Sequence, residues 1–181
     1  DGFSNPTDLN FTTRSAPVLS SSTPVDNAAS VALAQNLILT FDQVVNVSTG
    51  SIHLYKVDTP NALIESIAAN NGARVSGSGT NTITIDWSSN LGGSTDYFIN
   101  IDNNAFTNNN GTLNYAGISD TTSLNFSTIL KPSLSSSTPS DDGSGVYLNS
   151  NLDLVFNENV VQGTGNIVLY KSSDNSIVES L

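Results

Sequence analysis

One long segment of this chain occurs twice. Pro17 to Lys56 is repeated from Pro132 to Lys171, an offset of 132 − 17 = 115 residues. Both copies open with Leu-Ser-Ser-Ser-Thr-Pro and close with Leu-Tyr-Lys. About half of the positions in residues 1–56 are identical to those 115 residues later, far above the roughly 1 in 20 expected by chance. Because a repeat of this length matches one ordinary domain, the sequence predicts a tandem array.

The repeat divides the chain into three predicted parts. Residues 1–16 correspond to the C-terminal strand of a preceding repeat, residues 17–131 to a complete repeat, and residues 132–181 to the N-terminal part of a following repeat. Neither partial repeat has enough strands to bury its own apolar face. We therefore expect the missing strands to come from an adjoining molecule by strand donation, or from flanking sequence.

Apolar and polar residues alternate with a period of two along most of the complete repeat, which is typical of half-buried strands. Turn-forming residues such as Thr59-Pro60-Asn61 separate these segments. Seven or so strands, spaced by about 8 to 12 residues, predict an all-β, Greek-key β-sandwich. The alternating apolar positions are Leu37, Leu39 and Phe41; Ile52 and Leu54; Ile83, Ile85 and Trp87; and Tyr97, Ile99 and Ile101.

An edge strand and single helical turns are predicted for short segments of the repeat. Ser20 to Thr23, followed at once by Pro24, predicts an edge strand. Single helical turns fit Ala28 to Leu33 or Ser88 to Leu91.

Several motifs of the repeat resemble the bacterial Ig-like domains of S-layer proteins and long repetitive secreted adhesins. The resemblance covers the complete repeat and both partial ones. It implies an Ig-like sandwich that acts mainly as a spacer, at the bacterial cell surface or outside the cell. The motifs are Pro-x-Leu-x-Ser-x-x-Pro-x-Asp from Pro17 to Asp26, Thr49-Gly50-x-Ile52-x-Leu54-Tyr55, Asp96-Tyr97, Ala116-Gly117-Ile118-Ser119-Asp120 and Leu124-Asn125-Phe126.

Charge and composition exclude several kinds of partner. The net charge of −11 repels phosphate groups, so nucleic acid binding is not expected. No apolar run approaches the roughly 20 residues that cross a bilayer, so direct membrane insertion is not expected either. The absence of Cys removes disulfides and thiolate sites.

The sequence predicts no catalytic residues and no enzyme activity. His53 is the only histidine, and its counterpart in the second copy is Val168, which favours a partly packed or outward-facing strand residue over a catalytic one. No Gly-x-Ser-x-Gly segment is present to expose a serine nucleophile. Trp87 and Tyr97 fit either a platform on which a sugar stacks or, as we favour, core packing.

No cofactor is predicted, with calcium as the alternative for the acidic residues. Calcium binds carboxylate, amide and backbone oxygens, and Asp102, Asn103 and Asp120 offer that chemistry near one end of the sandwich. The competing interpretation is that these side chains bind their own backbone in Asx turns.

The sequence as a whole therefore predicts a non-catalytic extracellular structural module, a spacer or building block of a bacterial surface fibre, S-layer or adhesin. Its partners would be neighbouring repeats or subunits. The alternative function is a module that binds carbohydrate or a partner protein through exposed loops, such as Asn103 to Gly111.

Overall fold

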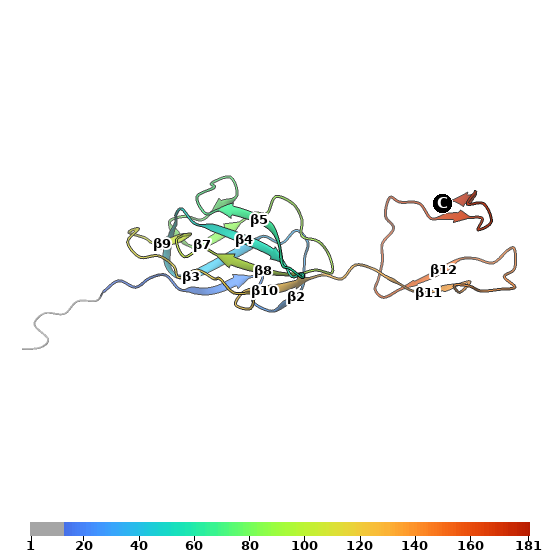
Figure 1. Cartoon of the computed structure of the whole chain (residues 1–181), viewed down its shortest axis with the longest axis horizontal. Coiled ribbons are helices and arrows are strands. Elements are labelled where there is room, and N and C mark those ends of the chain that lie inside the picture. The colour runs from blue at the N-terminus through green and yellow to red at the C-terminus, as the bar shows by residue number, and fades with distance from the viewer. Residues whose placement is uncertain (1–12) are drawn as a thin grey trace, which may run out of the picture. The chain divides into compact units, whose positions relative to one another are not determined.

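The computed structural model describes residues 13–181, which form an all-β protein (Figure 1). The chain divides between Lys131 and Pro132 into two compact units. Of the predicted closing strand in residues 1–16, residues 1–12 lie outside the described part. Within residues 13–181 no helix is long and apolar enough to cross a membrane.

The first unit is a sandwich of two five-stranded sheets. One sheet has the order β1-β3-β7-β6, with β9 also paired to β3, and the other has the order β2-β10-β8-β4-β5. Strand β2 runs parallel to β10, and the other pairs of this unit are antiparallel. The predicted all-β sandwich is confirmed. The strands are β1 (Leu19–Thr23), β2 (Ala28–Val31), β3 (Leu37–Val47), β4 (Ser51–Lys56), β5 (Ala62–Ala68), β6 (Val75–Ser76), β7 (Thr80–Ile85), β8 (Asp96–Ile101), β9 (Phe106–Asn108) and β10 (Asn125–Thr128).

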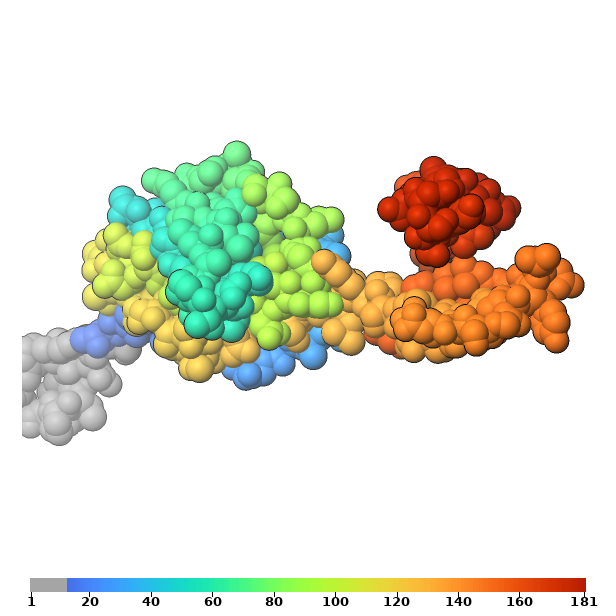
Figure 2. All heavy atoms as spheres, turned by 45° about the vertical axis from the view of Figure 1, so that its right-hand side comes forward, coloured from blue at the N-terminus to red at the C-terminus, as the bar shows by residue number. Residues whose placement is uncertain are grey.

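The core lies between the two sheets, where the alternating apolar positions meet. Leu37, Leu39 and Phe41 of β3 are 0, 0 and 2% exposed, which confirms the predicted inward face. Figure 2 shows the atoms of this unit packed into one continuous body. Further fully buried side chains are Val45, Ile52, Leu54, Ile83, Ile85, Ile99, Phe106 and Leu124.

The edges of the sheets confirm one prediction and correct another. Ser20 to Thr23 lies in β1, at the edge of the first sheet. Neither predicted helical turn forms. Ala28–Val31 is strand β2 beside β10, and residues 88–91 form a bend without helix. Asn27 and Ser30 both have a φ of 58°, a left-handed conformation that interrupts a right-handed helix.

The loop from Asn103 to Gly111 also differs from expectation, because its middle is strand β9. Phe106, Thr107 and Asn108 are 0, 7 and 3% exposed. The Asn108 side-chain oxygen accepts hydrogen bonds from the backbone N–H groups of Thr112 (2.9 Å) and Leu113 (3.2 Å). The centre of this loop is therefore not accessible to a ligand.

The second unit contains two separate two-stranded sheets. β11 (Leu134–Thr138) pairs with β12 (Asp153–Phe156), and β13 (Val168–Tyr170) pairs with β14 (Ile177–Ser180). Leu152, Ile167 and Leu169 are 54, 52 and 56% exposed, although their counterparts Leu37, Ile52 and Leu54 are buried. This unit thus leaves exposed the kind of apolar face that the first unit buries.

Candidate functional site

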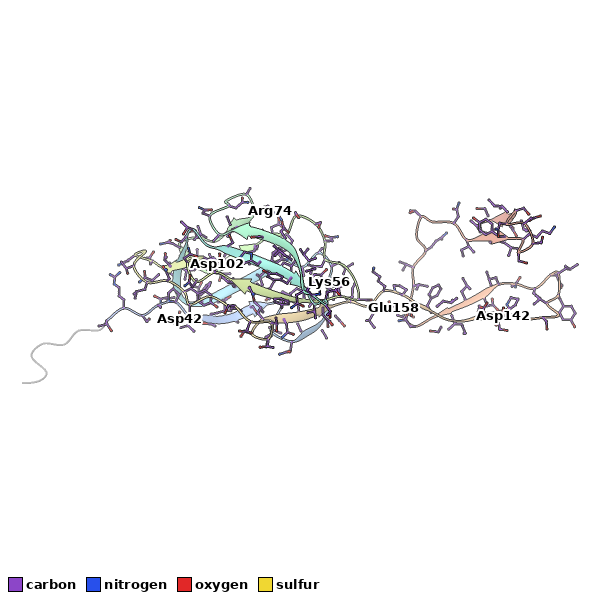
Figure 3. The ribbon with its side chains drawn as sticks, in the orientation of Figure 1. Asp42, Lys56, Arg74, Asp102, Asp142 and Glu158 are labelled. Carbon is purple, nitrogen blue, oxygen red and sulfur yellow. The ribbon has the colours of Figure 1, made fainter. Side chains whose placement is uncertain are left out.

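The three predicted calcium ligands lie near one end of the second sheet, after β8. Asp102, labelled in Figure 3, directly follows that strand. Its Oδ2 accepts a hydrogen bond from the backbone N–H of Ser51 (2.9 Å), and its Oδ1 lies 3.4 Å from His53 Nε2. Asn103 lines the same hollow as Asp102. One carboxylate oxygen of Asp102 is thus already bound to backbone.

Asp120 is saturated by donors from its own loop. Its Oδ1 accepts from the backbone N–H groups of Thr122 (2.8 Å) and Ser123 (2.7 Å), and its Oδ2 accepts from the Ser123 hydroxyl (2.7 Å). These donors hold the pKa of Asp120 well below its usual range, so the turn keeps its charged acceptor until the pH falls below the ordinary titration range of aspartate. The geometry is that of an Asx turn. No group of three His, Cys, Asp or Glu suited to a metal ion is found in residues 13–181.

We predict that millimolar calcium leaves the melting temperature of the chain nearly unchanged. The carboxylates of Asp102 and Asp120 already accept backbone N–H groups, so calcium would have to displace existing hydrogen bonds. Calorimetry with calcium and with EDTA measures the effect. A large rise that EDTA reverses and that Asp102→Ala abolishes would establish the ion site instead.

A hollow of about 440 Å³ opens beside Asp102, on the side of the second sheet that faces away from the core. His53 and Tyr55 alternate along β4 with the buried Leu54, so both point outward. Asn100 of β8 lies directly opposite His53 in the antiparallel register. We call this feature the His53 hollow. It is lined by the polar or aromatic residues His53, Tyr55, Asn100, Asp102, Asn103 and Ser119 and by the apolar residues Ile101, Ala116 and Ile118.

Aromatic rings form one wall of this outer face. Tyr55 stacks on Phe98, its cross-strand partner, with ring centroids 4.9 Å apart and an interplanar angle of 3°. Phe98 is 3% exposed but does not belong to the core cluster. His53 lies 6.4 Å from Tyr55, ring centre to ring centre. An antiparallel sandwich usually presents polar residues on such a face, so these rings are a distinctive feature.

His53 itself is a partly packed strand residue, as its counterpart Val168 predicted. Its side chain is 23% exposed, and Nε2 faces the Asp102 carboxylate. Its Nδ1 is buried without a hydrogen-bond partner among the described residues. Sequence reasoning missed the pairing of His53 with Asp102, because 49 residues separate them and only the register of β4 with β8 brings them together.

The other predicted aromatic site is part of the core. Trp87 and Tyr97 are 9 and 5% exposed, which confirms core packing. The hydroxyl of Tyr97 accepts a hydrogen bond from the backbone N–H of Gly92 (2.9 Å). A sugar has no open ring face to stack on there.

The last residues of the first unit, Ile129 to Lys131, are hydrogen-bonded to the rest of that unit. Ile129 N–H donates to the Val31 carbonyl (3.0 Å), and Ser94 N–H donates to the Ile129 carbonyl (2.8 Å). Lys131 N–H donates to the Ser94 hydroxyl (2.8 Å). Ser94 has a φ of 54°, so the loop that holds this segment is itself in a constrained conformation.

The second unit holds its first residues equally closely. Ser133 N–H donates to the Asn157 side-chain oxygen (2.7 Å), and Asn157 N–H donates back to the Ser133 carbonyl (3.0 Å). Val18 and Asp42 make the same pair of bonds in the first unit, at 2.8 and 3.0 Å. Pro132 is the single residue between the two attachments.

A family model described as Bacterial Ig-like domain matches residues 4–128. The match spans all ten strands of the first unit and more than two thirds of the chain, since 128 − 4 + 1 = 125 of 181 residues. No curated protein and no solved structure matches the chain.

Proposed function

Because the chain belongs to the bacterial Ig-like domain family, we propose that it is a non-catalytic structural module, a repeated spacer in a bacterial surface fibre, S-layer or adhesin. The family is associated with surface or extracellular proteins, so the module would work at the cell surface or outside the cell. Family membership supports the general role, and the particular residues of this chain support the finer one.

The first support is that both units pair their opening strands in the same register. Leu19 lies opposite Phe41 in the first unit, and Leu134 lies opposite Phe156 in the second. Both pairings continue for three further residue pairs, each offset by 115, with an irregularity at the same place. The second unit thus has the local pairing of the beginning of a further sandwich.

The second support is the exposed apolar face of the second unit. In the first unit the equivalent side chains are buried together with Ile83, Ile85, Ile99 and Phe106, which lie on β7, β8 and β9. Strands with the pattern of Thr80–Thr128 would therefore cover the face of the second unit. We propose that a neighbouring repeat or subunit supplies them, either in the same polypeptide or by strand donation.

The short junction is the observation that carries the spacer role. Lys131 is bonded to one unit and Ser133 to the next, and proline, whose φ is fixed, stands between them. In the proposed array, a junction with one unattached residue would give successive sandwiches little freedom to reorient, unlike a Gly/Ser linker. Successive modules would then transmit their spacing along a fibre.

Distance distributions between spin labels test this junction. We use a completed chain, in which a copy of residues 68–131 follows Leu181. Leu181 is the counterpart of Ile67, because the second copy is one residue shorter after Lys171 and the offset there is 181 − 67 = 114. The chain has no native Cys, so Ser20→Cys and Ser135→Cys label one exposed strand position in each unit. We expect a narrow distribution that broadens about twofold when five Gly and Ser residues are inserted after Pro132.

Two variants identify the attachments responsible. Ser94→Gly removes the hydroxyl that binds Lys131 but tolerates the left-handed backbone, and Asn157→Ala removes the acceptor for Ser133. Together they should broaden the distribution toward that of the insertion variant. A native junction already as broad as the insertion variant would contradict the spacer proposal.

A further inference from the structure

We propose that the His53 hollow is a binding site for an uncharged oligosaccharide. This inference goes beyond the spacer role and does not depend on the junction. Its volume of about 440 Å³ lies within the range of small-molecule sites. Hollows of about 400 and 360 Å³ exist elsewhere on the first unit, so volume alone does not single it out. The chemical groups that line the His53 hollow distinguish it from the other two.

His53 is a polar ring in a position that accepts an apolar residue. The second copy has Val168 here, although Tyr170 repeats Tyr55. The buried Nδ1 of His53 has no hydrogen-bond partner in the described chain, an arrangement that opposes folding. This unpaired nitrogen is a cost that the valine of the second copy does not have. The Nε2 of His53 faces Asp102 at the hollow, where it can contact a ligand.

Several groups that can bind a sugar hydroxyl lie around Nε2 of His53. The Asp102 side chain is 47% exposed and its Oδ1 lies 3.4 Å from Nε2, a long contact that leaves lone pairs on the carboxylate unused. The amide of Asn103 and the hydroxyl of Ser119 lie on the same lining. Vicinal sugar hydroxyls both donate and accept hydrogen bonds, so they match a carboxylate beside an imidazole and an amide.

Tyr55 provides an aromatic wall beside these polar groups. The ring stack of Tyr55 on Phe98 supports Tyr55 from one side and holds it in place. A ring held in this way presents apolar area and a hydroxyl at little entropic cost, which suits the C–H surface and the polar rim of a pyranose.

The charge of the chain sets the ligand class. With a net charge of −11 and Asp102 in the lining, the hollow disfavours uronic acids, sulfated sugars and phosphates. An uncharged oligosaccharide satisfies the polar groups without this repulsion.

NMR of the His53 imidazole tests the proposal directly, because the chain has only one histidine and its ring signals are unambiguous. The 181-residue chain is titrated with cellotetraose, maltotetraose, tetra-N-acetylchitotetraose and, as the anionic arm, tetragalacturonate. We expect at least one neutral tetrasaccharide to shift the imidazole signals saturably, with a dissociation constant near 1 mM. Tetragalacturonate should leave them unchanged.

Variants separate binding from folding. Asp102→Asn and Tyr55→Ala should each weaken the saccharide at least about tenfold, whereas Asp96→Asn, the same charge change outside this hollow, should not. His53→Val installs the residue of the second copy, so we expect an unchanged or higher melting temperature together with loss of binding, followed through the Tyr55 signals.

Three outcomes would overturn the proposal. The first is that no neutral saccharide shifts the imidazole signals. The second is binding that survives Asp102→Asn and Tyr55→Ala, which would place it elsewhere. The third is a response to calcium or zinc alone, which would make the hollow a cation site.

Discussion

Replacing Phe41 with alanine is expected to lower the unfolding free energy of the first unit by about 3–5 kcal/mol. Phe41 is 2% exposed at the centre of β3. Its ring lies 5.3 Å from the rings of both Phe106 and Tyr115, the second in an edge-on geometry. The truncation removes apolar burial and two aromatic contacts, and it leaves a cavity between two sheets that cannot close without moving strands.

Urea denaturation of a chain that ends at Lys131 measures this loss. Val44→Ala is the matched control, because Val44 lies on the same strand but is 38% exposed, and it should cost no more than about 0.5 kcal/mol. A loss below about 1 kcal/mol for Phe41→Ala would mean that β3 turns its other face to the core.

The counterpart, Phe156, extends this prediction to the second unit. Phe156 is only half-buried on β12, so Phe156→Ala should change the stability of the 181-residue chain by less than about 1 kcal/mol. In the completed chain the same substitution should cost about 3–5 kcal/mol, because appended strands would then enclose the ring.

The sequence predicted those elements in which burial of one face determines the pattern. Leu37, Leu39 and Phe41 could be assigned to one side because a strand that slipped by one residue would expose all three. The turn-forming residues Thr59-Pro60-Asn61 likewise separate two predicted segments, and they lie between β4 and β5, which pair with each other.

The missed elements depend on contacts between distant parts of the chain. β9 lies in an Asn-rich segment that looked like a loop, and it is a strand because Phe106 fills the core beside Phe41. β2 has too few residues to show a period, and it is defined by its parallel neighbour β10.

Some features of the candidate sites could also be predicted from the sequence, and others depend on contacts between distant residues. The sequence identified Asp102, Asn103 and Asp120 as oxygen donors and weighed Asx turns against calcium, and Asp120 forms such a turn. The pairing of Asp102 with His53 could not be predicted, because it depends on the register of two strands. The attachments at Ser94 and Asn157 have no local sequence signal either.

The completed chain is expected to turn the second unit into a stable sandwich. In the 181-residue chain Leu152, Ile167 and Leu169 remain about half exposed, whereas their counterparts in the first unit are 0–1% exposed. The appended copy of residues 68–131 supplies the strands that cover those counterparts. Burial of large aliphatic side chains contributes about 1.5–3 kcal/mol each, enough in sum to make a marginal unit fold cooperatively.

Hydrogen exchange of the β12 backbone amides, compared between the 181-residue chain and the completed chain, tests the claim that residues 132–181 begin a second Ig-like sandwich. A control copy carrying Ile83→Asp and Ile85→Asp in the appended segment places charges where the core should form. We predict that completion slows exchange at Leu154 by about a thousandfold or more, and that the control copy does not. Equal exchange in all three chains would contradict the claim.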